Sequence, residues 1–378
     1  MIERKESILT NKLIEEVETL KDFPVSMCTV PSDYNKFKYL DMIFCICKET
    51  GIIQIKKFPS LNDMYLFQHN FSFGSTWTNL FLKFTELIND FLQHEKELNV
   101  VEIGASECQL ANNILTNKNI NSYQIFEKNS SFKDLNEKIT VVNEYFGPNS
   151  YFSSNINLVI HSHLIEHVWN PVEFIQVLKQ KLNFGTYHCF IVPNLFETFS
   201  KKFTNSINFE HNFFLIEDYM DIILNNNSFT ICKKEYYLDH SIMYFTRLDK
   251  KEIIYKQYPN LYLQNKKLIH DFFNYQKDIV KTINSKTINF DGELYLFGAH
   301  IFSQYLIFFG LDTSKIRRIL DNCKNKNKRR LYGTKFLVEY PNVINSKEKV
   351  GVILKAASYQ ETIRNQLLDI NKNVIIFE

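Results

Sequence analysis

Three groups of residues in this chain have the types and spacing of a functional site. The first is VVEIGASECQL at 100–110, where a hydrophobic strand is predicted to run into Gly104 and then into a helix. Glycine at such a turn lets a ligand approach the backbone at the carboxyl end of the strand. Glu127 ends the next predicted strand, 23 residues after Gly104. That spacing suits a carboxylate that accepts hydrogen bonds from ribose hydroxyls.

The loop after Gly104 also indicates which cofactor it suits. A dinucleotide site needs G-x-G-x-x-G, because its glycines and the helix N-terminus hold pyrophosphate. Here Gly104 is the only glycine, and Glu107 at the start of the helix would repel pyrophosphate. A cofactor with an amine and a sulfonium and no phosphate fits this loop better. The sequence therefore favours S-adenosylmethionine over NAD.

The second group is His211 with Glu210 beside it, in the segment NFEHNFF at 208–214. Methyl transfer needs a base for the proton of the acceptor, and histidine suits this task because its ordinary pKa lies near neutrality. The alternative is a surface histidine within an aromatic patch.

The third group is three histidines, His161, His163 and His167, at the end of the predicted strand INLVI. They span a strand-to-helix junction and share no fixed face, so no metal site is predicted here. His167 is a second candidate base, with helix capping or packing as its alternative role. Ser162 lies where the methionine part of a cofactor would contact the carboxyl end of a parallel strand.

These segments resemble class I S-adenosylmethionine-dependent methyltransferases. VVEIGASECQL is similar to their first motif, and HSHLIEHVWNPVEFI to the segment that ends their fourth strand. Three stretches resemble the nucleotide-sugar C-methyltransferases in particular: IVPN followed by NFEHNFF, the C-terminal residues 295–334, and FKYLDMIFCICKETGIIQI at 37–55, which is similar to a zinc ribbon. The resemblance implies that Glu102, Gly104 and Ala105 form the cofactor loop, that Glu210 and His211 are an acid–base pair, and that His167 faces the substrate.

The chain departs from the family pattern at three places. Cys108 stands near the second loop glycine, and Asn208 stands where the family has a tyrosine. The ribbon-like segment offers Cys28, Cys45 and Cys47 without the paired C-x-x-C spacing, whereas a structural zinc needs four ligands. We therefore predict a degenerate ribbon and no bound zinc.

Alternating strand-like and helix-like segments must position these residues. From 76 to 248 they predict an α/β fold, with a mostly parallel, Rossmann-like methyltransferase sheet covered on both faces. From 249 to 378 they predict a second, smaller Rossmann-like domain that holds substrate, or that is purely structural, in which Gly298 and Asp321 repeat the glycine–acid spacing. Residues 1–75, the ribbon-like segment, are expected to open with a charged amphipathic helix.

Composition limits the classes of function. The chain has 378 residues, 45% of them hydrophobic, with a net charge of +2. This balance gives no strong field for nucleic acid or an acidic membrane. No apolar run of membrane-spanning length is present, and the seven scattered cysteines favour a reducing compartment. We expect a cytoplasmic enzyme whose partner is a small molecule, an activated sugar.

The predicted reaction is methyl transfer to carbon or oxygen of a nucleotide sugar or related metabolite, in surface-polysaccharide or modified-sugar biosynthesis. Two alternatives use the same sheets. An NAD(P)-dependent sugar oxidoreductase would need a glycine fingerprint that neither α/β segment has. A non-catalytic nucleotide-sugar-binding subunit would explain Cys108 and Asn208.

Overall fold

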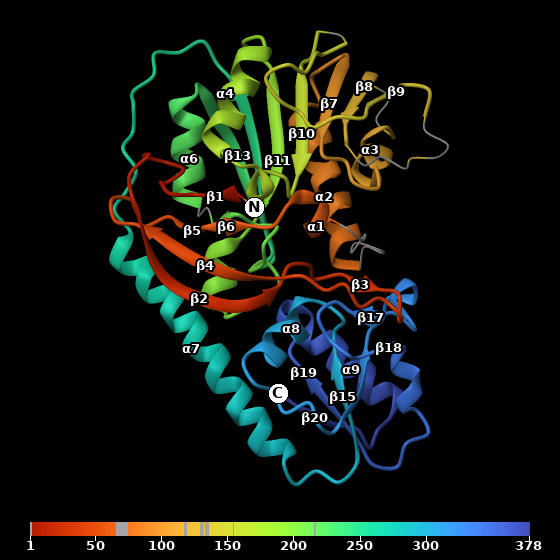
Figure 1. Ribbon diagram of the computed structural model, residues 1–378. Coiled ribbons are helices and arrows are strands. Elements are labelled where there is room, and N and C mark those ends of the chain that lie inside the picture. Colours follow the sequence, from red (N-terminus) through yellow and green to blue (C-terminus); the bar gives the residue numbers. More distant parts are fainter. Residues whose placement is uncertain are drawn as a thin grey trace. The chain divides into compact units, whose positions relative to one another are not determined.

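The computed structural model describes residues 2–65, 75–116, 119–128, 132, 136–153, 155–214 and 217–378 (Figure 1). The chain forms two compact units. The first contains residues 1–72, 195–214 and 260–378, and the second contains 73–194 and 215–259. The ribbon-like segment and the C-terminal α/β segment thus share one unit, which also takes in the stretch around His211. None of the helices in the described part of the chain is long and apolar enough to cross a membrane.

A seven-stranded sheet forms the centre of the second unit. Its strand order is β13-β14-β11-β10-β7-β8-β9. The strands β7 to β11 pair in parallel, and β14 pairs antiparallel with β11 on one side and with β13 on the other. The strands are β7 (Leu98–Ile103), β8 (Ile120–Phe126), β9 (Ile139–Val142), β10 (Leu158–Ser162), β11 (Tyr187–Pro193), β13 (Phe229–Tyr237) and β14 (Ser241–Leu248).

Helices cover both faces of this sheet, as the alternating segments predict. Apolar residues of α2 (Ser75–Phe91) and α3 (Gln109–Ile114) pack on one face. On the other face, Phe174 of α4 (Pro171–Lys181) contacts His161, and Asp221 of α6 (Glu217–Asn226) accepts a hydrogen bond from Tyr244. The Rossmann-like α/β fold expected for this segment is confirmed.

The order of the strands marks where a ligand belongs. From β7 the chain adds β8 and β9 on one side, and then crosses to place β10 on the other side. Ligands of open α/β sheets bind at the carboxyl ends of the strands, at such a switch point. Gly104 follows β7 and Ser162 ends β10, so both lie there.

The first unit contains a five-stranded parallel sheet of order β18-β16-β15-β19-β20. This is the second Rossmann-like sheet that the sequence predicts. Its strands are β15 (Glu293–Phe297), β16 (Ile316–Leu320), β18 (Val338–Glu339), β19 (Val350–Leu354) and β20 (Ile375–Phe377), and α8 (Ile301–Phe308) and α9 (Gln360–Ile370) connect them.

An antiparallel sheet of order β12-β5-β4-β2 completes the first unit. It contains β2 (Ile14–Pro24), β4 (Tyr39–Cys47), β5 (Ile53–Ile55) and β12 (Phe213–Phe214). The long helix α7 (Tyr262–Thr287) packs on this sheet through Phe272 and Phe273, and on the parallel sheet through Val280 and Ile283. Figure 1 shows α7 in teal, running past β2 and β4.

The expected N-terminal helix is wrong, because residues 14–24 form strand β2. The charged run IEEVETLK has local helix preference, but β2 pairs along its length with the buried strand β4. Side-chain packing against a neighbouring strand decides strand formation more strongly than local propensity does.

Candidate active site

The loop after β7 has an alternating left-handed backbone. Gly104, Ser106 and Cys108 have φ values of 75°, 51° and 59°. Gly104 donates its N–H to the carbonyl of Phe126 on β8 at 2.9 Å, and a Cβ at Gly104 would lie 3.0 Å from Cδ1 of Leu164. The left-handed conformation favours glycine at 104, and an added Cβ would require the Leu164 side chain to move by a few tenths of an ångström.

Ser106 and Cys108 adopt a conformation that glycine adopts at little cost. A side chain in the left-handed region costs roughly 1–2 kcal/mol, so such residues persist where the surrounding structure holds them. Cys108 is buried, and burial, followed by the charges of Glu102 and Glu127, raises the pKa of its thiol to about 12. The loop thus combines one glycine with two left-handed non-glycine residues, Ser106 and Cys108, of which the sequence reasoning missed Ser106.

Glu127 lies directly after β8, and its side chain reaches this loop. Its Oε2 accepts the backbone N–H of Ser106 at 3.0 Å, and its own N–H bonds the carbonyl of Val142 on β9. The carboxylate is therefore fixed beside the loop at the switch point. The structure brings together the two residues, Gly104 and Glu127, whose spacing suggests a ribose site.

The buried residues Glu102 and Ala105 support this loop from within the unit. Glu102 is only 2% exposed, and its Oε2 accepts a hydrogen bond from Tyr123 at 2.6 Å. Burial raises the pKa of Glu102 to about 7, the charge of Glu127 adds to that rise, and the tyrosine bond opposes it. Ala105 is buried, and its carbonyl accepts the N–H of Cys108.

The histidines at the end of β10 point to different places. The ring of His161 is buried on the α4 face, where its Nε2 lies 3.0 Å from Nε2 of His188 and its ring stacks on Phe190. Burial lowers the pKa of both histidines, to about 3 for His188. His161 is therefore a neutral core residue.

Ser162 and His163 lie at the switch point. Nδ1 of His163 is 3.0 Å from Oγ of Ser162, and its Nε2 is 3.0 Å from Oγ of Ser241 at the start of β14. Trp77 of α2 contacts the ring of His163, with centroids 4.6 Å apart. The sequence reasoning missed Ser241. Ser241 pairs with Pro193 at the carboxyl end of β11, and this pairing places it at the same edge of the sheet as Ser162.

A short 3-10 helix, η1 (Ile165–His167), follows at the same edge. Its Glu166 is 2% exposed, and burial raises the pKa of its carboxyl to about 8. Nε2 of His167 lies 4.0 Å from Oε1 of Glu166, and the His167 ring is partly buried. An ionisable pair at this edge is consistent with the expected second base.

His211 and Glu210 belong to the first unit, in the segment between α5 (Leu195–Ser200) and β12. Nδ1 of His211 lies 2.7 Å from the carbonyl oxygen of Ser206. A carbonyl only accepts, so Nδ1 carries the proton and Nε2 of the neutral ring holds the basic lone pair. Glu210 is buried beside it, and its N–H bonds Oδ1 of Asn208 at 2.8 Å. Asn208 thus shapes the backbone of this segment.

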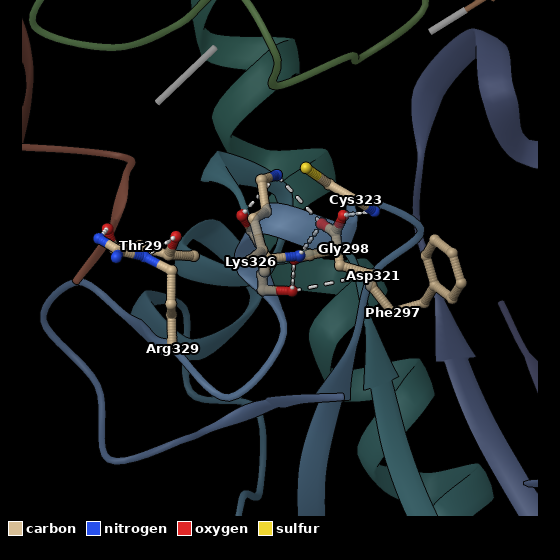
Figure 2. Close-up of polar contacts among 9 residues, drawn as sticks. Thr29, Phe297, Gly298, Asp321, Cys323, Lys326 and Arg329 are labelled. Carbon is tan, nitrogen blue, oxygen red and sulfur yellow. Dashed lines mark hydrogen bonds and ion pairs between the residues drawn. The ribbon is translucent and has the colours of Figure 1, made fainter. Parts of the chain in front are cut away.

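The glycine–acid pair of the C-terminal sheet has a different environment (Figure 2). Gly298 follows β15 with a φ of 100°, and Ala299 donates its N–H to Oδ2 of Asp321 at 2.9 Å. The same oxygen accepts from Nζ of Lys326 at 3.1 Å, and Oδ1 accepts the N–H of Cys323 at 2.9 Å. Both side chains of this ion pair are 13% exposed. The carboxylate is therefore engaged by its own unit, which favours the structural alternative for this sheet.

The cysteines of the ribbon-like segment lie apart. Cys45 and Cys47 are buried on β4, whereas Cys28 packs with Val30 and Tyr332 in a separate cluster. Within the described residues of this unit, no three metal-ligating side chains converge.

Comparisons with known proteins add the following. No protein-family model and no curated protein sequence matches the chain. Among solved structures, it is similar to the N-methyltransferase NodS from Bradyrhizobium japonicum, with 11% identity over 46% of this chain and 98% of that one, at a TM-score of 0.35. It is also similar to 1,6-didemethyltoxoflavin-N1-methyltransferase from Burkholderia thailandensis, solved with S-adenosylhomocysteine, with 10% identity over 47% and 82% at 0.38.

A further match is an 8-amino-8-demethyl-D-riboflavin dimethyltransferase from Streptomyces davawensis, with 13% identity over 44% of this chain and 53% of that one, at 0.35. At such scores the matches carry no argument about function, which is drawn from the site itself.

Proposed function

We propose that the chain transfers a methyl group from S-adenosylmethionine to a small, polar acceptor of the sugar type. The observation that carries this proposal is the contact between the left-handed loop at 104–108 and Glu127. A carboxylate fixed beside an open backbone turn suits the ribose of an adenosyl cofactor. The bound cofactor would supply the electrophilic methyl group on its sulfonium.

The residues present fit a cofactor without phosphate. Glu107 lies within the loop and Glu127 beside it, so the local charge is negative and disfavours pyrophosphate. The same charge suits a sulfonium and an ammonium. The backbone of Gly104 and Ala105 would contact the cofactor. Glu102 would support the loop, and Ser162 would contact the methionine part.

His211 is the proposed base for the proton of the acceptor. Its Nδ1–H bond to Ser206 directs the lone pair to Nε2, and Glu210 orients the ring or binds substrate. His167 is the second candidate, with Glu166 beside it. The acceptor we favour is a nucleotide sugar or a related metabolite of surface-polysaccharide or modified-sugar synthesis, methylated on carbon or oxygen.

The test combines binding with turnover. We expect calorimetric titration to show binding of S-adenosylhomocysteine and none of NADH, and the chain to transfer labelled methyl from S-adenosylmethionine to a member of a nucleotide-sugar panel. His211→Ala should abolish turnover with little change in cofactor affinity, and His94→Ala, at an exposed site, should change neither.

Other outcomes would identify the alternatives. NADH binding would favour an oxidoreductase. Nucleotide-sugar binding without cofactor binding would favour a non-catalytic binding subunit. Unchanged turnover of His211→Ala would eliminate His211 as the base and leave His167.

A further inference from the structure

Four side chains at the carboxyl edge of the seven-stranded sheet form one continuous chain of polar contacts. Ser162 Oγ lies 3.0 Å from His163 Nδ1, and His163 Nε2 lies 3.0 Å from Ser241 Oγ. Ser241 Oγ in turn lies 2.6 Å from Nδ1 of His240. The contacts join the end of β10 to the turn between β13 and β14, two places far apart in the sequence.

This chain of contacts can take two polarities. A hydroxyl both donates and accepts, and a neutral imidazole has one nitrogen of each kind. If Ser162 donates to His163, then His163 carries its proton on Nε2, Ser241 donates to His240, and His240 carries its proton on Nε2. In the reverse polarity both rings carry the proton on Nδ1. The two histidines therefore change tautomer together whenever Ser241 accepts from one ring and donates to the other.

The surroundings partly shield this chain of contacts from water, since Ser241 is buried and the other three residues are half-buried. Trp77 stands edge-on to both rings, with centroids 4.6 Å from His163 and 4.9 Å from His240. Ser241 is fully buried, and burial lowers the pKa of His240 to about 4. A low dielectric strengthens hydrogen bonds between such groups and makes each one depend on the next.

The backbone holds the two rings in place at some cost. His163 has a φ of 49°, a conformation that side chains rarely adopt. Its N–H bonds the carbonyl of Ile191, and the carbonyl of His240 accepts the N–H of Asn194. Strained residues held in this way cluster at functional sites.

We propose that Ser162, His163, Ser241 and His240 are a proton relay that leads away from the carboxyl edge of β10. Its use to discharge the proton of a methylated acceptor rests on the proposed function. There, methyl transfer from sulfur to the acceptor releases one proton, which the proposed base takes up first and later releases at the carboxyl edge of β10. Ser162 Oγ takes up a proton and donates its original hydroxyl proton to Nδ1 of His163. His163 then passes its Nε2 proton to Oγ of Ser241, and Ser241 passes its hydroxyl proton to Nδ1 of His240. His240 releases its Nε2 proton to water.

The relay makes a prediction that a merely structural cluster does not. In the full-length protein with ¹⁵N-labelled histidine rings, NMR should show the same fraction of Nε2–H tautomer at His163 and His240. Ser162→Ala should change this fraction at His240, although Ser162 does not contact that ring. Ser241→Ala should remove the response of His240 to Ser162→Ala, and Ser241→Thr, which keeps the hydroxyl, should retain it.

The contrary result is equally clear. If Ser162→Ala changes His163 alone and leaves the tautomer of His240 unaltered, the four residues are a structural cluster and the relay is wrong. Should Ser241→Ala fail to fold, the response of His240 to Ser162→Ala decides by itself. Titration of the wild-type protein with S-adenosylhomocysteine separates the two proposals, because coupled tautomers without cofactor binding would overturn the methyl transfer and leave the relay.

Discussion

The seven-stranded sheet and the five-stranded sheet contain the same strand–glycine turn, but the turn has different surroundings in each. In each, a strand ends at a glycine with positive φ, and a loop N–H bonds a carboxylate at the end of the next strand. The pairs are Ser106 with Glu127 and Ala299 with Asp321. Asp321 also binds Cys323 and the ammonium of Lys326, so its charge is compensated within its own unit.

The comparison shows that the same glycine–acid arrangement occurs in both sheets, so the spacing alone does not identify a cofactor site. An acid that already holds a lysine and two backbone N–H groups is a structural tie. Glu127 is held by a loop N–H beside two further left-handed residues, at the switch point where open α/β sheets bind ligands. We therefore propose that the cofactor binds at the sheet that contains β7 and β8.

The largest difference is expected when each glycine is replaced by alanine. Gly104→Ala should weaken S-adenosylhomocysteine binding by at least tenfold, because the new Cβ meets Leu164 at 3.0 Å and the φ of 75° becomes strained. Gly298→Ala should leave the affinity unchanged, because its Cβ meets only Phe302 at an ordinary 3.7 Å in the other sheet.

Calorimetry of the two variants tests this contrast. Gly298→Ala still pays for its φ of 100°, so a lower melting temperature is expected for it. Equal losses of affinity in both variants would show that the two turns do not differ in use.

The next largest expected effect is on the pH dependence of stability in the unit that contains Glu102 and Glu166. Burial raises the pKa of Glu102 to about 7 and that of Glu166 to about 8. With a raised folded-state pKa, each carboxyl contributes stability that is fully present below the ordinary carboxyl pKa of 4.5 and is lost as the pH rises from there to the folded-state values of about 7 and about 8. The lowered pKa values of His188 and His240 act below pH 6.5, so they do not oppose this trend above it.

We therefore expect the free energy of unfolding to fall by about 2 kcal/mol between pH 6.5 and 8.5. The fluorescence of Trp77 and Trp169, the two tryptophans of the chain, reports this unit specifically. Glu166→Gln should remove the larger part of the slope and Glu102→Gln a smaller part, and Glu97→Gln, at an exposed site, should remove none. A slope that Glu102→Gln leaves unaltered would contradict the role of this carboxyl.

The smallest effect concerns the two left-handed non-glycine residues of the loop. Ser106→Gly, at an exposed site, should raise the free energy of unfolding by about 0.5 kcal/mol, since the relief of left-handed strain exceeds the added entropy of the unfolded chain. Cys108→Gly should lower it instead, because it removes a buried side chain from the core. Ala105→Gly is the matched control in the same loop, and it should destabilise because Ala105 lies outside the left-handed region. Urea unfolding measures all three, and a stabilised Ala105→Gly would show that strain is not the cause.

What the sequence predicts here follows from local patterns. The strand–glycine–helix order located Gly104, and spacing located Glu127, because both depend on neighbouring elements of one chain segment. The left-handed conformation of Ser106 and Cys108 has no such signal, since neither residue type favours it. The ion pair of Asp321 with Lys326 and the contact of His163 with Ser241 are tertiary contacts, and β2 became a strand through its partner β4.

The central claim is that Glu127 and its loop bind the adenosyl cofactor. Calorimetric titration of S-adenosylhomocysteine into the wild type, Glu127→Gln and Asp321→Asn tests it directly. We predict binding by the wild type, at least tenfold weaker binding by Glu127→Gln because hydrogen bonds to a charged acceptor are lost, and unchanged binding by Asp321→Asn. No binding by the wild type at millimolar ligand, or equal affinity of Glu127→Gln and the wild type, would contradict the account.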